Sequence, residues 1–178
     1  GDMMGSIMAK RMGLPVKKFV IATNENYEFP EFVKTGEYNK IVPSIKCISN
    51  AMNVGHPSNL ARFIDLYDGQ MDEVGNLNKK PDMQKIQSDV FSISVSDSET
   101  RETIKKAYEK HNLLLEPHGA VGWAGLSHYL EESGDKGLCV SVETAHPAKF
   151  PEEIVRLLNI EPEAPEALAK LDDMKEHY

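Results

Sequence analysis

The sequence predicts an α/β protein with a partial, doubly wound parallel sheet and helices on both faces. Three short apolar segments are typical of buried strands, and they lie at residues 16–23, 89–97 and 137–144. They alternate with helical segments of about ten or more residues, which is the pattern of βαβ units. Doubly wound sheets usually have more strands, and this chain opens on a helix with no strand before it. We therefore expect the chain to be part of a domain.

The first half of the chain predicts two helices around one strand. Residues 1–13 repeat methionine and isoleucine at helical spacing, and Gly13 marks the end of that helix. The run over 16–23 is short and largely apolar, as in a buried parallel strand. Residues 56–69 place their apolar side chains on one helical face. The remaining segments are expected to be a loop with one short helical turn at 25–38 and an irregular or strand segment at 42–51.

The second half begins with the strand over 89–97, in which serine alternates with apolar residues. Ser96 and Glu99 have capping-box spacing, which predicts a helix over 98–111. A further helix is expected over 118–134. It carries glycine at every third position, which lowers helix stability but allows a close backbone approach on one face. These glycines are Gly119, Gly122 and Gly125.

The strand over 137–144 is followed by a turn and then by a helix over 151–160, which Pro151 begins at its first turn. Residues 161–166 are rich in proline and glutamate and predict a linker. The chain then continues into an amphipathic terminal helix over 166–178. We accordingly divide it into an α/β part at 1–160 and a linker with a terminal helix at 161–178.

Composition excludes several classes of partner. At 178 residues, 40% hydrophobic and 27% charged, the chain has the size and balance of one globular domain. A net charge of −8 leaves no basic stripe for nucleic acid, and no apolar run approaches the ~20 residues that cross a bilayer. Cys47 and Cys139 lie in apolar, strand-like surroundings without CxxC spacing, so we expect two buried thiols and a cytoplasmic protein.

Four polar clusters fall where strands or their equivalents end, and a shared sheet edge would bring them together. They are Thr23–Asn24, Asp97–Ser98, Glu116–Gly119 and Thr144–His146. Each cluster also has a structural interpretation: a turn, a helix N-cap, a helix start, and a turn with a core histidine, respectively. Ligand types for a metal are present, but no pair has the short fixed spacing of a zinc site. The G-x-S-x-G motif of hydrolases and the G-x-G-x-x-G motif of dinucleotide-binding units are absent from the sequence.

Taken together and in order, five motifs resemble threonine synthase, a pyridoxal-phosphate (PLP) enzyme of the tryptophan-synthase-β type. The match spans residues 1 to about 160. The motifs are "GD..G.IMAKRMGLPVKKFVIATNEN", "SNAMNVGHPSN", "VSDSET", "EPHGAVG" and "ETAHPAKF". Asn53 stands where the family usually has aspartate. The resemblance implies the C-terminal part of the large PLP-binding domain of fold type II.

The resemblance also implies roles for individual residues. The family's phosphate loop ends in Gly-Asp, which corresponds to Gly1 and Asp2. Its hydroxyl partner for the PLP ring nitrogen corresponds to Thr144, and a neutral hydroxyl there leaves that nitrogen largely unprotonated. The remaining positions are expected to lie around the cofactor or the substrate. Near the cofactor these are Glu116, His118 and His146, and near the substrate Asn24 and Lys149.

One departure from the family pattern bears on activity. Family members carry a lysine in a Phe-Lys-Asp segment, which forms the Schiff base with PLP, and no such segment is present here. We expect the parent enzyme to convert O-phospho-L-homoserine and water to L-threonine and phosphate, and this chain alone to be inactive. The alternative is a non-catalytic α/β binding module that kept the scaffold. Loss of the preceding strands predicts self-association through an exposed sheet edge.

Overall fold

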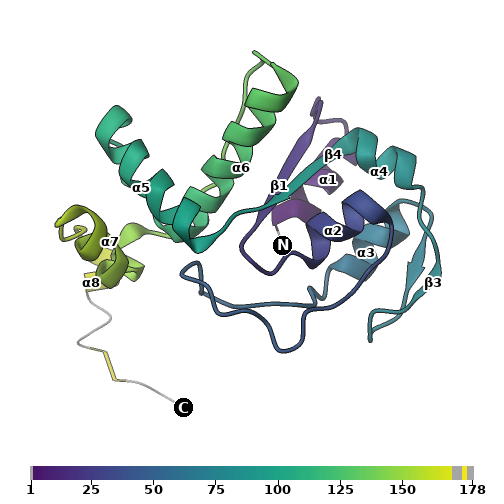
Figure 1. The fold of residues 1–178 in the computed structure, drawn as a ribbon, viewed down its shortest axis with the longest axis horizontal. Coiled ribbons are helices and arrows are strands. Elements are labelled where there is room, and N and C mark those ends of the chain that lie inside the picture. Colours follow the sequence, from purple (N-terminus) through teal and green to yellow (C-terminus); the bar gives the residue numbers. More distant parts are fainter. Residues whose placement is uncertain (1, 170–173, 176–178) are drawn as a thin grey trace.

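A parallel pair of strands lies at the centre of the computed structural model, which describes residues 2–169 and 174–175 (Figure 1). Strand β1 (Phe19–Thr23) pairs with β4 (Val90–Ser94) in a register that runs from Phe19 opposite Val90 to Thr23 opposite Ser94. A second, antiparallel pair joins β2 (Gln70–Met71) to β3 (Leu77–Lys79). The predicted α/β class and parallel sheet are confirmed.

Helices cover both faces of the parallel pair. On one face, Phe19 and Val90 belong to a core formed with the helices on either side of β1 and before β4. On the other face, Ala22 packs against Val121 and Ala124 of the long helix that follows. Side chains that alternate along a strand point to opposite faces, so the pattern of β1 accounts for both layers. The first face carries α1 (Asp2–Arg11), α2 (Glu28–Thr35), α3 (Leu60–Leu66) and α4 (Met83–Asp89), and the second α6 (Pro117–Ser133).

Helices α5 (Asp97–His111) and α7 (Pro151–Leu158) share a core with α6. Helix α5 lies beside α6, and its first turn is capped by Ser96, whose Oγ accepts from the Glu99 N–H as the capping-box spacing predicts. Helix α7 begins at its proline and packs against α5. Helix α8 (Glu166–Ala169) is the described part of the predicted terminal helix, whose other residues largely lie outside the described ones.

The glycines of α6 let the helix lie close to its neighbours. A Cβ at Gly125 would stand 2.5 Å from the Ala22 Cβ of β1, which is closer than real Cβ atoms come. A Cβ at Gly122 would stand 3.6 Å from the Ser141 Oγ, an ordinary contact. The close approach predicted from the glycine spacing is therefore present, and Gly125 is the position that the sheet itself requires.

The predicted third strand over 137–144 is wrong in this structure. The segment runs without helix or strand, and within the described residues it pairs with no other strand. Leu138, Val140 and Val142 are 98%, 78% and 58% exposed, so the apolar alternation faces outward. Cys139 is exposed as well, contrary to the expected buried thiol, whereas Cys47 is buried as predicted. Strand-like patterning needs a neighbouring strand to become a strand, and none is available here.

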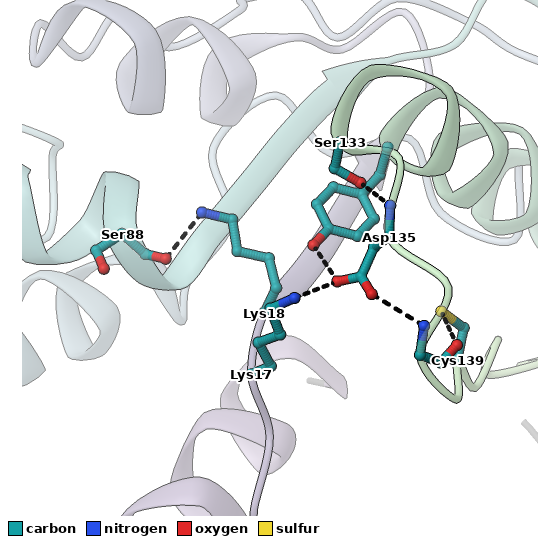
Figure 2. A network of polar contacts seen from close by, with 8 residues as sticks. Lys17, Lys18, Ser88, Ser133, Asp135 and Cys139 are labelled. Atoms are coloured by element: carbon teal, nitrogen blue, oxygen red, sulfur yellow. Dashed lines mark hydrogen bonds and ion pairs between the residues drawn. The ribbon is translucent and has the colours of Figure 1, made fainter.

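A polar network fixes the start of this segment beside the beginning of β1 (Figure 2). The Lys17 Nζ lies 2.6 Å from Asp135 Oδ2, which also accepts from the Tyr129 hydroxyl at 3.2 Å. The Gly137 N–H donates to Asp135 Oδ1 at 2.9 Å. These hydrogen bonds, that of Lys17 first, lower the pKa of Asp135 to about 2. The turn after α6 is thereby held at the β1 edge that β4 does not occupy (Figure 2).

Several boundaries differ from the sequence-based expectation. The loop expected at 25–38 contains the two-turn helix α2, and the helix expected over 56–69 is shortened to α3. Helix α4 and the β2–β3 hairpin had not been predicted. The segment 42–51 is irregular, which is one of the two expected forms. These elements are short or contain proline, so too few residues remain to show the periodicity of a helix or a strand in the sequence.

Candidate functional site

The carboxyl ends of β1 and β4 hold a loop in place, and Asn24 makes the first contact. Its amide Nδ2 donates to the Ser49 Oγ at 3.1 Å and to the Ser49 carbonyl at 3.3 Å. Its Oδ1 accepts from the backbone and side-chain N–H groups of Asn26, at 3.1 and 3.0 Å. We call residues 45–53 the 45–53 loop. The Asn24 amide thus binds this loop through Nδ2 and holds Asn26 through Oδ1.

Two more side chains bind the backbone of the 45–53 loop. Asn26, which is buried, donates to the Ile45 carbonyl at 2.9 Å and accepts from the Ile45 N–H at 2.8 Å. Asp97, the first residue of α5 and three residues past the end of β4, accepts from the Ile48 N–H through Oδ1 at 3.0 Å. Its own N–H donates to Glu25 Oε1 at 3.0 Å. The ends of both parallel strands therefore converge on one loop.

The start of α6 contributes a buried carboxylate and an imidazole. Glu116 is 1% exposed and caps the helix, accepting from the Gly119 N–H at 2.6 Å and the His118 N–H at 2.9 Å. Its Oε2 also lies 2.6 Å from His118 Nδ1. Burial would raise the pKa of Glu116, but the hydrogen bonds from His118 and from these backbone N–H groups hold it below its usual value. Because its own carboxylate occupies it, this helix end is not open to an anion.

His118 links this helix start to the 45–53 loop. The Ala51 N–H donates to His118 Nε2 at 3.3 Å, so Nε2 carries the lone pair and Nδ1 carries the proton that Glu116 accepts. The imidazole ring also contacts the Phe150 ring, with centroids 5.1 Å apart. Both ring nitrogens of His118 are thus hydrogen-bonded, so the side chain connects the helix start to the loop.

The segment 143–150 lies along the same helix start. The Glu143 carboxylate lies where a Cβ of Gly119 would stand, and Phe150 packs on His118. Between them Thr144 is exposed, and no hydrogen bond to its hydroxyl occurs among the described residues. His146 Nδ1 accepts from the Ala148 N–H at 3.2 Å and so caps the short 3₁₀ turn η1 (Pro147–Lys149), whose last residue is an exposed lysine.

The structure thus brings together most of the residues predicted for the site. The Asn24, Asp97, Glu116 and His118 side chains all contact the 45–53 loop or the helix start beside it. Thr144 directly follows Glu143, whose carboxylate lies against Gly119 at that helix start. Asp2 lies exposed at the start of α1, and Gly1 lies outside the described residues. Sequence reasoning missed Asn26 and Phe150. Asn26 follows Asn24 by two residues, which is a signal for an Asx-type turn.

Two surface hollows lie away from the 45–53 loop. One of about 610 Å³ lies between α1 and α3, with Met4, Met8 and Leu66 in its lining. The other, of about 510 Å³, is lined by His146 and by the proline-rich residues 162–165. Within residues 2–169 and 174–175, no three His, Cys, Asp or Glu side chains gather as a metal site would need. In the same part of the chain, no helix has the length and apolar character to cross a membrane.

Comparison with known proteins agrees with the motif resemblance. Residues 119–178 match a family model described as threonine synthase, C-terminal. The threonine synthase of Haemophilus influenzae is 35% identical over 170 residues, which cover 96% of this chain and 36% of that protein. The threonine synthase of Saccharomyces cerevisiae is 34% identical, and the match covers 98% of this chain and 40% of that protein. The chain therefore spans little more than a third of the length of these relatives.

Solved structures give the same answer for the fold. The crystal structure of threonine synthase from yeast superposes with a TM-score of 0.81 at 29% identity, covering 99% of this chain and 41% of that one. A PLP-bound threonine synthase from Brucella melitensis gives a TM-score of 0.81 at 27% identity, covering 99% of this chain and 40% of that one. The expected resemblance and the expected fold type are confirmed.

Proposed function

We propose that this chain is the C-terminal part of a longer protein that is a PLP-dependent threonine synthase, because it is similar to the C-terminal region of threonine synthases over nearly its whole length. Its reaction would convert O-phospho-L-homoserine and water to L-threonine and phosphate, as a carbon–oxygen lyase acting on phosphate. Identity maintained across 96% of the chain is the observation that carries this proposal. Residues 1–178 alone are expected to form no threonine, because no lysine lies in a Phe-Lys-Asp context.

Within that enzyme, Thr144 is the proposed partner of the cofactor ring nitrogen. Its exposed hydroxyl makes no hydrogen bond to the described residues, so it is free to bond such a nitrogen, and this fits the group. When bound, PLP supplies the electron sink for carbanion chemistry. Thr144 would hold the ring in place by a hydrogen bond, without transferring a proton to the ring nitrogen. Its hydroxyl has no acidic proton to give, so the ring nitrogen would stay largely unprotonated.

The neighbouring residues are proposed to frame this position. Glu116 and His118 bind one another and the surrounding backbone, which supports a role in shaping the cofactor side of the cleft. Asn24 would do the same for the substrate side through the 45–53 loop. His146 and Lys149 are exposed beside Thr144, and the Lys149 charge would attract an anionic ligand. We assign residues 1–160 to the PLP-binding domain and 161–178 to a linker and terminal helix.

Substitution of Thr144 in the longer protein tests this proposal. We expect Thr144→Ser to keep threonine formation within a few-fold of wild type, and Thr144→Val to lower it about tenfold through loss of the proposed hydrogen bond to the ring nitrogen. The matched control is Thr35→Val, because the Thr35 hydroxyl bonds only Glu31 of its own helix and Glu37 just after it, among the described residues. Absence of threonine formation by the wild-type protein would refute the function. Equal activity of the Ser and Val variants would refute the role of Thr144 alone.

The partner that we propose for the chain on its own is a second copy. Leu138, Val140 and Val142 present an apolar row, and an exposed strand-like edge favours pairing between chains. Sedimentation of residues 1–178 is expected to show concentration-dependent association, which Val140→Lys reduces. Val74→Lys, at another exposed valine, is the control and should leave association unchanged. A monomer at all concentrations would contradict this proposal.

A further inference from the structure

We propose that His118 is a positioning residue that fastens the tip of the 45–53 loop to the start of α6. The assignment rests on the proposed function for its relevance to a cofactor cleft, but its evidence is the geometry of the ring. We call the three contacts of the His118 ring, to Glu116, Ala51 and Phe150, the His118 clasp.

The hydrogen-bond directions of the clasp follow from its partners. Glu116 Oε2 already accepts from the His118 backbone N–H, and Oε1 accepts from Gly119, so the carboxylate acts as an acceptor throughout. His118 Nδ1 must then donate. The other nitrogen, Nε2, faces the Ala51 N–H, which can only donate. The ring therefore needs one proton, on Nδ1, and loses the Ala51 contact if it gains a second.

The contact to Ala51 differs from the other contacts of the 45–53 loop, because it comes from α6 and not from the ends of the strands. Ile45, Ile48 and Ser49 are held by side chains at the ends of β1 and β4. Ala51 is the residue of the loop that a hydrogen bond joins to α6, among the residues that the structure describes. Met52 beyond it is 76% exposed. Loss of the clasp should therefore release residues 50–52 and leave residues 45–49 in place.

The third side of the ring connects the loop tip to the segment that carries Thr144. Phe150 packs on the imidazole, and Glu143 rests on Gly119 one residue along the helix. Both ends of the segment 143–150 thus lie against the same turn of α6. A change at His118 reaches the loop tip by a hydrogen bond and the Thr144 segment by ring packing.

Two substitutions separate the two ring nitrogens. His118→Asn keeps a donor at the position of Nδ1 but has nothing that reaches Ala51. His118→Gln carries an acceptor at the position of Nε2. We measure backbone amide exchange by NMR without PLP or substrate. The Ala51 amide is expected to exchange roughly three to ten times faster in the Asn variant, as for loss of one hydrogen bond, and within about twofold of wild type in the Gln variant. The Ile45 amide should not change in either.

The outcomes discriminate between the possibilities. Ala51 exchange that is unchanged in the Asn variant overturns the clasp, and so does faster exchange of Ile45 and Ala51 together, which would mean general loosening. His128→Asn on the same helix is the control, because His128 bonds Glu99 of α5 and not the 45–53 loop, and it should leave Ala51 as in wild type. Because the exchange measurement uses no cofactor or substrate, its result tests the His118 clasp independently of whether the protein forms threonine.

Discussion

Glu28 is expected to make the protein less stable as pH rises, and Glu28→Gln should remove this dependence. The side chain lies at the start of α2, is 3% exposed, and its Oε2 has no hydrogen-bond partner among the residues that the structure describes. Burial raises its pKa from 4.5 to about 7. Because the pKa of Glu28 is higher in the folded than in the unfolded state, its contribution to the free energy of unfolding is fully present below pH 4.5. That contribution is lost as pH rises through about 7.

The size of the effect follows from the shift. Each pKa unit corresponds to about 1.4 kcal/mol, so complete ionisation of Glu28 lowers the free energy of unfolding by roughly 3.5 kcal/mol, of which about 2.5 kcal/mol falls between pH 5 and pH 8. Glutamine has the same shape and no titration. Its amide also leaves a buried group without a partner, but that cost is equal at both pH values and cancels in the comparison.

The assay is urea unfolding followed by circular dichroism at pH 5 and pH 8, for wild type and Glu28→Gln. We expect the variant to gain about 2.5 kcal/mol relative to wild type between the two pH values, with unchanged urea dependence. Glu31→Gln, on the exposed side of the same helix, is the control and should follow wild type. Parallel pH dependence of wild type and Glu28→Gln would refute the reasoning.

Two further predictions concern the packing of α6 and the turn after it. Gly125→Ala should lower the free energy of unfolding by about 1–3 kcal/mol, because its Cβ would meet Ala22 at 2.5 Å, while Gly122→Ala should be neutral or stabilising by up to ~1 kcal/mol. Thermal unfolding measures both, and equal melting temperatures would contradict this packing. Asp135→Ala should speed Gly137 amide exchange roughly three- to tenfold. In wild type that protection should persist above pH 4 and disappear as pH falls through about 2, since the pKa of Asp135 is lowered to about 2; early loss at pH 5 would contradict it.

The parts of the fold that sequence predicted well are those set by local pattern. The apolar run of β1, the alternation in β4 and the Ser96 cap of α5 are each encoded within a few residues. Helix α4 and the β2–β3 hairpin were missed, because their apolar residues are few and their elements short. Element type is read from periodicity, and two or three residues do not make a period.

The candidate site was predictable in outline for a different reason. Parallel strands end at one edge, so polar residues after β1 and β4 had to meet there, as Asn24 and Asp97 do. What they hold was not predictable. Their partners in the 45–53 loop are mostly backbone N–H and carbonyl groups, such as those of Ile45 and Ile48, and backbone groups leave no trace in residue type.

The segment 137–144 shows how a sequence pattern can describe surroundings that the chain itself does not provide. Leu138, Val140 and Val142 alternate as in a strand, yet all three are exposed. Asp135 ties the start of the segment to Lys17 beside β1, and Glu143 ties its end to Gly119 of α6, so its path follows the open side of β1 in the same direction. A segment laid along a sheet edge, apolar on alternate residues and unpaired, is placed as a strand that lacks a partner. Relatives about three times as long have the chain to supply one, so the error in predicting this strand lies in its pairing and not in its pattern.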